Sequence, residues 1–173
     1  KPADMGKKEE VIAFANWCLS FAVPDVVVNN AGIFHPGNVL DEPEGSLESH
    51  IETNLYSAYH LTRLLSPKMI ERGTGHIINI SSVAGKETYP FGNVYCASKH
   101  AVQSLTKGMR IDMLKHGIKV SSVSPGAVET EFSLVRFNGD INKAKQIYKG
   151  FTPLNAQDIA DTILFIVTRP KHV

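Results

Sequence analysis

The chain has 173 residues, of which 43% are hydrophobic and 20% charged, and its formal net charge is +1. This composition is typical of one globular domain with a sizeable core. The near-zero charge gives no indication of a nucleic acid or a membrane as partner. Its two cysteines, Cys18 and Cys96, belong to no metal-binding or redox spacing. We therefore expect no disulfide framework, no metal and a reducing compartment such as the cytoplasm.

Two hydrophobic patterns alternate along the chain. Helical stretches have apolar residues three and four apart, and between them lie short β-branched runs, typical of strands buried on both faces. Pro67 falls inside one helical pattern and predicts a kink or break near Leu65. In chain order we predict a helix over Lys8–Phe21, a strand at Asp25–Val28, a helix over Ser46–Glu71, a strand at His76–Ile80, a helix over Val94–Lys115, a strand at Ile118–Val123, two helical pieces at Glu131–Phe137 and Ile141–Tyr148, and a last helix from Asn155 or Asp158.

This helix–strand alternation predicts one α/β domain over residues 1–173, with a parallel sheet and right-handed crossovers. In such sheets, ligands bind beyond the carboxyl ends of the strands, which meet at one edge. Small, polar or turn residues follow all three predicted strands, and each group alone could be only a turn. They are Asn29-Asn30-Ala31-Gly32, Ser81-Ser82 and Ser124-Pro125-Gly126. Their convergence predicts a site at this edge.

Tyr95 and Lys99 lie four residues apart on a predicted helix, so their side chains share one face. A phenol with its ordinary pKa of about 10 is a poor base at neutral pH, and a nearby cation lowers that pKa. The pair therefore suits proton transfer, although the same spacing also occurs without any role. Ser82 offers a hydroxyl to a substrate oxygen. Asn54, a poor helix former, lies either on a solvated face or where it can hold a water against Lys99.

Five motifs follow one another along the chain: Asn29-Asn30-Ala31-Gly32, a helical Asn54, Ser81-Ser82-Val83-Ala84-Gly85, Tyr95-x-x-x-Lys99 and Pro125-Gly126-x-Val128-x-Thr130. In this order and at these separations they resemble the short-chain dehydrogenase/reductase family, and the resemblance extends from Lys8 onward. It implies a Rossmann-like, doubly wound parallel sheet. It also implies hydride transfer between a nicotinamide cofactor and a carbonyl or secondary alcohol, with NADP as the expected cofactor and NAD as the alternative.

The resemblance also implies a role for each site residue. Tyr95 is expected to be the catalytic acid/base, and Lys99 to lower its pKa and bind the nicotinamide ribose. Ser82, rather than Ser81, is expected to bind the substrate oxygen, and Asn54 to hold a relay water. The residues expected to contact the cofactor are Asn30, Ala31, Gly32, Tyr95, Lys99, Pro125, Gly126, Val128 and Thr130.

The chain departs from the family pattern in several respects. It contains no G-x-x-x-G-x-G run, the loop that cradles the pyrophosphate at a helix N-terminus. The family's first strands, with the residue that separates NAD from NADP, and its last strand are absent from this sequence as well. A sheet cut on both sides would expose unpaired edges. We therefore expect a longer protein in which these residues form the C-terminal two-thirds of the domain; the alternative is a non-catalytic fragment.

The segment Glu131–Asp140 resembles the subgroup that acts on serine and other 3-hydroxy acids with NADP. Within it, Arg136 is expected to pair with a substrate carboxylate, together with Ser82 and Tyr95 on the substrate side. The alternative for Arg136 is a surface or subunit-contact arginine. The alternatives for the substrate are a 3-oxoacyl thioester, a sugar or a steroid.

Family members assemble as homodimers or homotetramers through the two long helices, Ser46–Glu71 and Val94–Lys115. The resemblance therefore implies such an assembly here. Apolar residues on these helices fit either a subunit interface or packing on the sheet, and the sequence leaves both open. They are Leu61, Leu65, Met109 and Met113.

Overall fold

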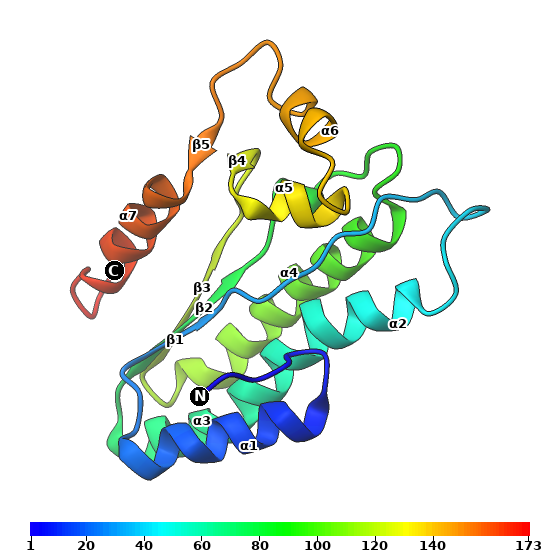
Figure 1. The fold of residues 1–173 in the computed structure, drawn as a ribbon. Helices are drawn as coiled ribbons and strands as arrows, with labels where there is room; N and C mark the ends of the chain where they lie inside the picture. The colour runs from blue at the N-terminus through cyan, green and yellow to red at the C-terminus, as the bar shows by residue number, and fades with distance from the viewer.

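The computed structural model describes residues 1–173 (Figure 1). Its main sheet is parallel, with strand order β1-β2-β3. The strands are β1 (Val26–Asn29), β2 (Gly75–Ile80) and β3 (Ile118–Val123). Val27 pairs with Ile77, which pairs with Val120, so the carboxyl ends of all three strands meet at one edge. The predicted parallel α/β sheet is confirmed.

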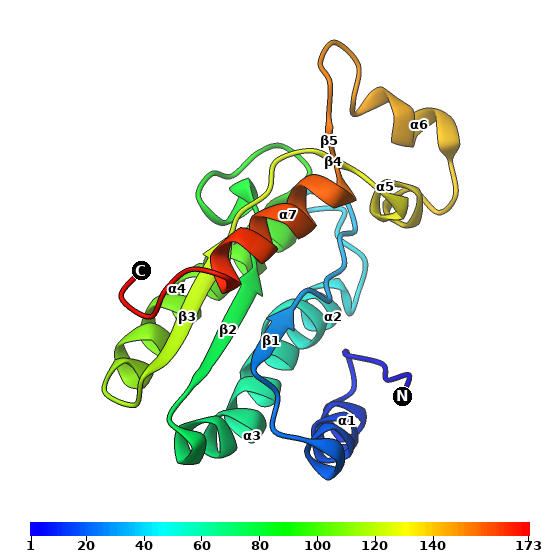
Figure 2. The same cartoon turned by 90° about the vertical axis from the view of Figure 1, so that its left-hand side faces the viewer.

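Helices cover both faces of this sheet. On one face lie α1 (Lys8–Phe21), α3 (Ser57–Arg72) and α4 (Asn93–Leu114), and α7 (Ala156–Val167) lies over the other (Figure 2). Beyond the carboxyl edge lie two short helices, α5 (Glu131–Arg136) and α6 (Ile141–Gln146), and the small parallel pair β4 (Val128–Glu129) and β5 (Leu154–Asn155). None of the helices combines the length and the apolar character needed to cross a bilayer.

The main core lies between the sheet and the layer of α1, α3 and α4. Its buried members are Val11, Ala15, Val27, Leu61, Leu65, Met69, Ile77, Met109, Ile118 and Val120, with Met113 packed against them. The apolar residues whose role the sequence left open therefore pack inside the domain. Burying each such side chain contributes about 1.5–3 kcal/mol.

The predicted helix over Ser46–Glu71 is one continuous run with an irregular turn. It consists of α2 (Ser46–His50), the π-helical turn η1 (Ile51–Tyr56) and α3. The expected break near Leu65 is wrong, since the helix continues through Pro67. The proline removes the hydrogen-bond donor of the Arg63 carbonyl. Because both residues are exposed, water can bind that carbonyl instead. The irregularity occurs instead around Asn54, and π turns often mark functional sites.

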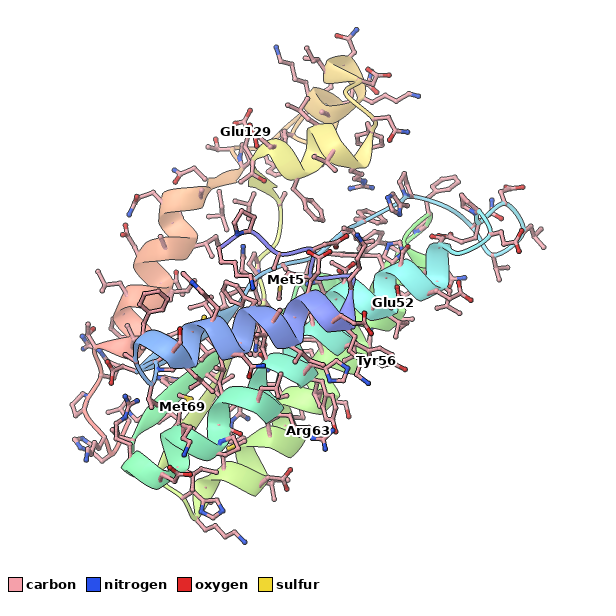
Figure 3. All side chains as sticks on the ribbon, turned by 60° about the horizontal axis from the view of Figure 1, so that its bottom comes forward. Met5, Glu52, Tyr56, Arg63, Met69 and Glu129 are labelled. Carbon is pink, nitrogen blue, oxygen red and sulfur yellow. The ribbon has the colours of Figure 1, made fainter.

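Two faces of this helical run have different surroundings. Figure 3 labels Glu52, Tyr56 and Arg63 along the run, and all three side chains are exposed. Leu61 and Leu65 on the other side are buried in the core. The run ends at Gly73, whose φ of 73° closes the last turn at little steric cost.

The start of α7 was predictable from the local sequence, whereas the small sheet was not. Asn155 and Asp158 form a capping box that starts α7, as either residue alone suggested. The pair β4 and β5 was not predicted, because a strand of two residues shows no periodicity. β5 leads directly into α7 (Figure 1).

We expect replacement of Leu65 by alanine to lower the free energy of unfolding by about 3 kcal/mol, because it leaves a cavity in the core. Leu65 is 3% exposed, whereas Leu40, in the loop before α2, is 90% exposed. Leu40→Ala is the matched control and should change stability by about 0.5 kcal/mol at most. Urea unfolding followed by circular dichroism measures both. Equal effects in the two variants would contradict the assignment of the core.

Candidate active site

Tyr95 and Lys99 lie on the first turns of α4 and are both buried, with 8% and 4% of their surface exposed. The Lys99 Nζ donates a hydrogen bond of 2.9 Å to the carbonyl oxygen of Ile80, at the end of β2. It lies 5.8 Å from the centroid of the Tyr95 ring. The helix therefore brings both side chains to the carboxyl edge of the sheet, as the spacing predicts.

Ser82 begins the turn that follows β2, and its hydroxyl lies beside the Tyr95 phenol. Its Oγ accepts a hydrogen bond of 3.1 Å from the Ala84 amide, which fixes its orientation. The preceding Ser81 is different, because its hydroxyl donates to the backbone oxygen of Lys99 at 3.3 Å. Of the two serines, Ser82 therefore lies with the phenol, as alternating strand geometry predicts.

The electrostatics of the pair differ from the expectation. Burial raises the pKa of the Tyr95 phenol above its ordinary value, and the nearby Ser82 hydroxyl opposes this rise only in part. Burial also lowers the pKa of the Lys99 ammonium to about 8. The expected lowering of the Tyr95 pKa by Lys99 is thus absent from this structure, because desolvation of the phenol is the larger effect.

Asn54 lies in the π turn, buried, with its side chain aimed at the loop after β1. Its Oδ1 accepts a 2.7 Å hydrogen bond from the Ile33 amide, and its Nδ2 donates to the Ile33 carbonyl and to Ser98 Oγ. Both N–H groups of the amide are therefore engaged within the protein. A water held against Lys99 would have to bind an oxygen of Asn54 instead.

Gly32 fills the narrow space between Asn54 and Lys99. A Cβ atom at this position would lie 3.2 Å from Asn54 Oδ1 and 3.5 Å from Lys99 Nζ. A larger residue would therefore push apart two of the predicted site residues. The glycine is needed here for close approach rather than for a turn.

A cavity of about 710 Å³ opens at this edge of the sheet, and all nine residues expected to contact a cofactor line it. They are Asn30, Ala31, Gly32, Tyr95, Lys99, Pro125, Gly126, Val128 and Thr130. The structure thus brings these residues together from three separate segments of the chain. A cavity of about 790 Å³ at the opposite end of the strands contains no residue of these motifs.

Arg136, at the end of α5, lies on the aromatic side of the site. Its Cζ is 3.9 Å from the centroid of the Phe34 ring, and Phe34 stacks on Tyr95 with 4.4 Å between the ring centroids. The guanidinium forms no ion pair with an acidic side chain, and its Nε is buried without a hydrogen-bond partner. An unpaired guanidinium thus lies one aromatic ring away from the phenol.

Comparison with known proteins addresses the family directly. Residues 1–139 match the family described as short chain dehydrogenase. The chain belongs to this family. A solved structure titled as the closed form of serine dehydrogenase complexed with NADP⁺ is 34% identical, with a TM-score of 0.91, and the match covers 99% of this chain and 70% of that one. The expected Rossmann-like fold is confirmed.

Two curated relatives among short chain dehydrogenases are also similar to the chain. The NADP-dependent 3-hydroxy acid dehydrogenase of Schizosaccharomyces pombe is 40% identical over 154 residues, which is 88% of this chain and 60% of that protein. Sulfoacetaldehyde reductase 2 of Chromohalobacter salexigens is 40% identical over 149 residues, which is 85% of this chain and 59% of that protein. The chain thus spans about 60% of the length of these relatives.

Several residues of this short chain dehydrogenase site were not singled out from the sequence. Phe34 lies in the loop after β1, where no periodicity identifies a buried ring. Phe132 lines the cavity, with its ring centroid 6.3 Å from that of Tyr95. Four residues of the last helix line it as well: Ala156, Ile159, Ala160 and Ile163. Only the closeness of Phe34 to the Asn29–Gly32 motif could have indicated a role.

Proposed function

We propose that the chain forms the catalytic part of an NADP-dependent oxidoreductase that interconverts a carbonyl compound and a primary or secondary alcohol. One observation carries this proposal most strongly. The Tyr95 phenol and the Lys99 ammonium lie in a cavity lined by every residue expected to contact the cofactor, and the Ser82 hydroxyl lies next to the phenol. Phenol, hydroxyl and ammonium are the groups that a carbonyl reduction needs to stabilise a developing alkoxide and supply its proton.

The cavity fits the nicotinamide and ribose half of a dinucleotide. The small residues Ala31 and Gly32 leave room for a flat group against the backbone, and Lys99 offers a cation within reach of ribose hydroxyls. When bound, the nicotinamide supplies or accepts the hydride. NADP is proposed over NAD, because the S. pombe relative is named as NADP-dependent and the serine dehydrogenase structure is titled as an NADP⁺ complex.

Tyr95 and Ser82 handle the substrate oxygen in this proposal. In reduction, the Tyr95 Oη donates its proton to that oxygen while the Ser82 hydroxyl donates a hydrogen bond to it. In oxidation, the phenolate accepts the alcohol proton. Because burial raises the pKa of Tyr95, the residue holds its proton at neutral pH and is ready to act as an acid. Lys99 and an oxygen of Asn54, on either side of Gly32, would return the proton from water.

We propose an anionic substrate, because the unpaired Arg136 guanidinium lies against Phe34, whose ring stacks on Tyr95. The side chain is half-buried, and a guanidinium partly removed from water without a counter-ion is costly unless the ligand supplies one. The names of the relatives agree with this choice. A 3-hydroxy acid and sulfoacetaldehyde both place the reacting carbon one methylene away from an acidic group, a carboxylate in one case and a sulfonate in the other. A 3-hydroxy acid is the substrate we propose.

A substrate panel with both cofactors tests the function. We expect NADP-dependent oxidation of 3-hydroxypropanoate and serine, and slower or no turnover of an acetoacetyl thioester, a sugar and a steroid. Absorbance at 340 nm measures each rate. Turnover of the thioester, sugar or steroid alone would replace the hydroxy-acid proposal with the corresponding reductase. No turnover with any compound would favour the non-catalytic alternative.

The charge at Arg136 can be tested separately. Arg136→Gln should raise KM for a 3-hydroxy acid by about 10- to 100-fold, because one charge-assisted contact is lost. Turnover of a neutral alcohol should stay within about threefold of the wild type. The KM of Arg136→Lys should lie between those of the wild type and Arg136→Gln, because an ammonium keeps the charge without the bidentate geometry. The exposed Arg63 provides the control as Arg63→Gln. Equal losses on charged and neutral substrates would assign Arg136 to structure instead.

We also propose that the protein assembles as a homodimer or homotetramer through the outer sides of its two long helical runs. Four large apolar residues there are exposed although the core beneath is complete: Tyr56, Tyr59, Ile111 and Leu114. Light scattering during size-exclusion chromatography gives the mass of the assembly. A monomer at all concentrations tested would contradict the proposal.

A further inference from the structure

His50, the last residue of α2, is a fully buried histidine that the proposed chemistry does not use. Its Nδ1 lies 2.7 Å from the carbonyl oxygen of Ser46, and its Nε2 lies 3.2 Å from the backbone nitrogen of His35. A carbonyl only accepts and an amide only donates. The Nδ1 must therefore carry the proton and the Nε2 must accept, so that only the neutral imidazole satisfies both contacts.

Asn54 repeats this contact one turn later in the same helical run. It accepts from the Ile33 amide, as His50 accepts from the His35 amide. Residues four apart share one side of a helix, so both side chains face the same loop. The two acceptors hold the residues on either side of Phe34.

Phe34 connects the two chemical ends of the site. Its ring stacks on Tyr95 at an interplanar angle of 23°, and the Arg136 guanidinium lies against it. The ring is almost fully buried, so its position follows that of its own backbone. A shift of the His35 backbone would therefore move the Phe34 ring, which lies between Tyr95 and Arg136.

We propose that His50 is a positioning residue that, as the neutral imidazole, fixes Phe34 and thereby sets the orientation of the substrate between Tyr95 and Arg136. The part that concerns the substrate rests on the proposed function. The part that concerns the loop stands on the hydrogen bonds alone. Positioning matters for rate because a misplacement of about 1 Å can cost up to about 100-fold.

The groups around His50 determine how it responds to pH. His35 faces it from the loop, with 5.3 Å between the two ring centroids, and Tyr95 faces it from α4 at 6.4 Å. Glu42, in the loop before α2, hydrogen-bonds to the Ser46 hydroxyl. Burial lowers the pKa of His50 most, with a further lowering by His35, while the Ser46 carbonyl and Glu42 raise it. The imidazole is therefore neutral at pH 7, and in acid its Nε2 gains a proton that faces the His35 N–H.

Two substitutions separate positioning from mere packing. His50→Gln keeps an acceptor and a donor, whereas His50→Leu fills the space and keeps neither. With a 3-hydroxy acid and NADP at pH 7.5, we expect kcat/KM to fall at least tenfold in His50→Leu and to stay within about threefold in His50→Gln. His116→Gln, in the turn after α4, is the control and should match the wild type. A loss in the glutamine variant equal to that in the leucine variant would overturn the proposal.

The pH profile gives a readout that packing alone would not change. Below pH 6, kcat/KM should fall less in His50→Gln than in the wild type, since the amide has no proton to gain. Identical profiles would overturn the titration of His50 as the cause.

Hydrogen exchange measured by NMR tests the loop without any need for turnover. At pH 7 the His35 amide should be protected in the wild type and in His50→Gln, and exchange at least tenfold faster in His50→Leu. The Ile33 amide, held by Asn54, should stay protected in all three and shows that the protein is folded. Unchanged exchange of His35 in His50→Leu would overturn the inference. If the three proteins show the expected exchange of the His35 amide but the wild type turns over no substrate, only the proposed function is overturned.

Discussion

Tyr95→Phe should lower kcat by at least about 1,000-fold while leaving the fold intact. General acid catalysis contributes about 10²- to 10⁴-fold, and the phenol is the only group that the proposal uses to donate the proton. Phenylalanine keeps the ring that stacks on Phe34 and loses only the hydroxyl beside Ser82. The loss of one hydrogen bond should change stability by about 1 kcal/mol at most.

Initial rates at saturating cofactor, together with thermal unfolding, measure this variant. Tyr59→Phe, which removes the hydroxyl of an exposed tyrosine on α3, is the matched control and should keep the rate of the wild type. In the oxidation direction the wild-type rate should rise with pH, because burial raises the pKa of Tyr95 and its phenolate is scarce near neutrality. A Tyr95→Phe rate within tenfold of the wild type would end the proposed proton transfer.

The parts of the site that lie at strand ends were predictable from the sequence. Strand ends converge because parallel strands share one direction, so Asn30, Ser82 and Pro125 could be placed near one another without coordinates. Tyr95 and Lys99 followed from the period of a single helix. The structure lines one cavity with all nine residues that the family resemblance assigned to the cofactor.

Other features depend on the path of loops and on burial, which no local period encodes. Phe34 is buried in a loop whose neighbouring residues, Ile33 and His35, donate hydrogen bonds to residues of a distant helix. The π turn at Asn54 could not be read from helix propensity, and the proline expected to break the helix lies where water satisfies the backbone. The rise of the Tyr95 pKa was missed for a related reason. The helical spacing indicates a nearby cation but gives no measure of how far the phenol is removed from water.

Lys99→Met should separate activity from stability. The pKa of Lys99 is lowered from 10.5 to about 8 by burial, a cost of about 3 kcal/mol for holding the charged form in the folded protein at neutral pH. The unfolded chain binds this proton more tightly, so the stability of the wild type should rise as the pH increases from about 8 toward 10.5. Methionine removes the cost, although it also removes the hydrogen bond to the Ile80 carbonyl.

We therefore expect the free energy of unfolding of Lys99→Met at pH 7 to equal that of the wild type or to exceed it by up to about 2 kcal/mol. The variant should also lack the rise in stability above pH 8. Its kcat/KM should nevertheless fall at least 100-fold, because the cation next to the proton donor and the ribose contact are both lost. Lys107→Met, on the exposed side of α4, is the control for removing a lysine from the same helix. Chemical unfolding across pH and steady-state rates measure the two effects. A Lys99→Met variant that is less stable than the wild type but fully active would show that Lys99 has a structural role. A lysine that the reaction requires should instead lower the stability of the fold and be indispensable for activity.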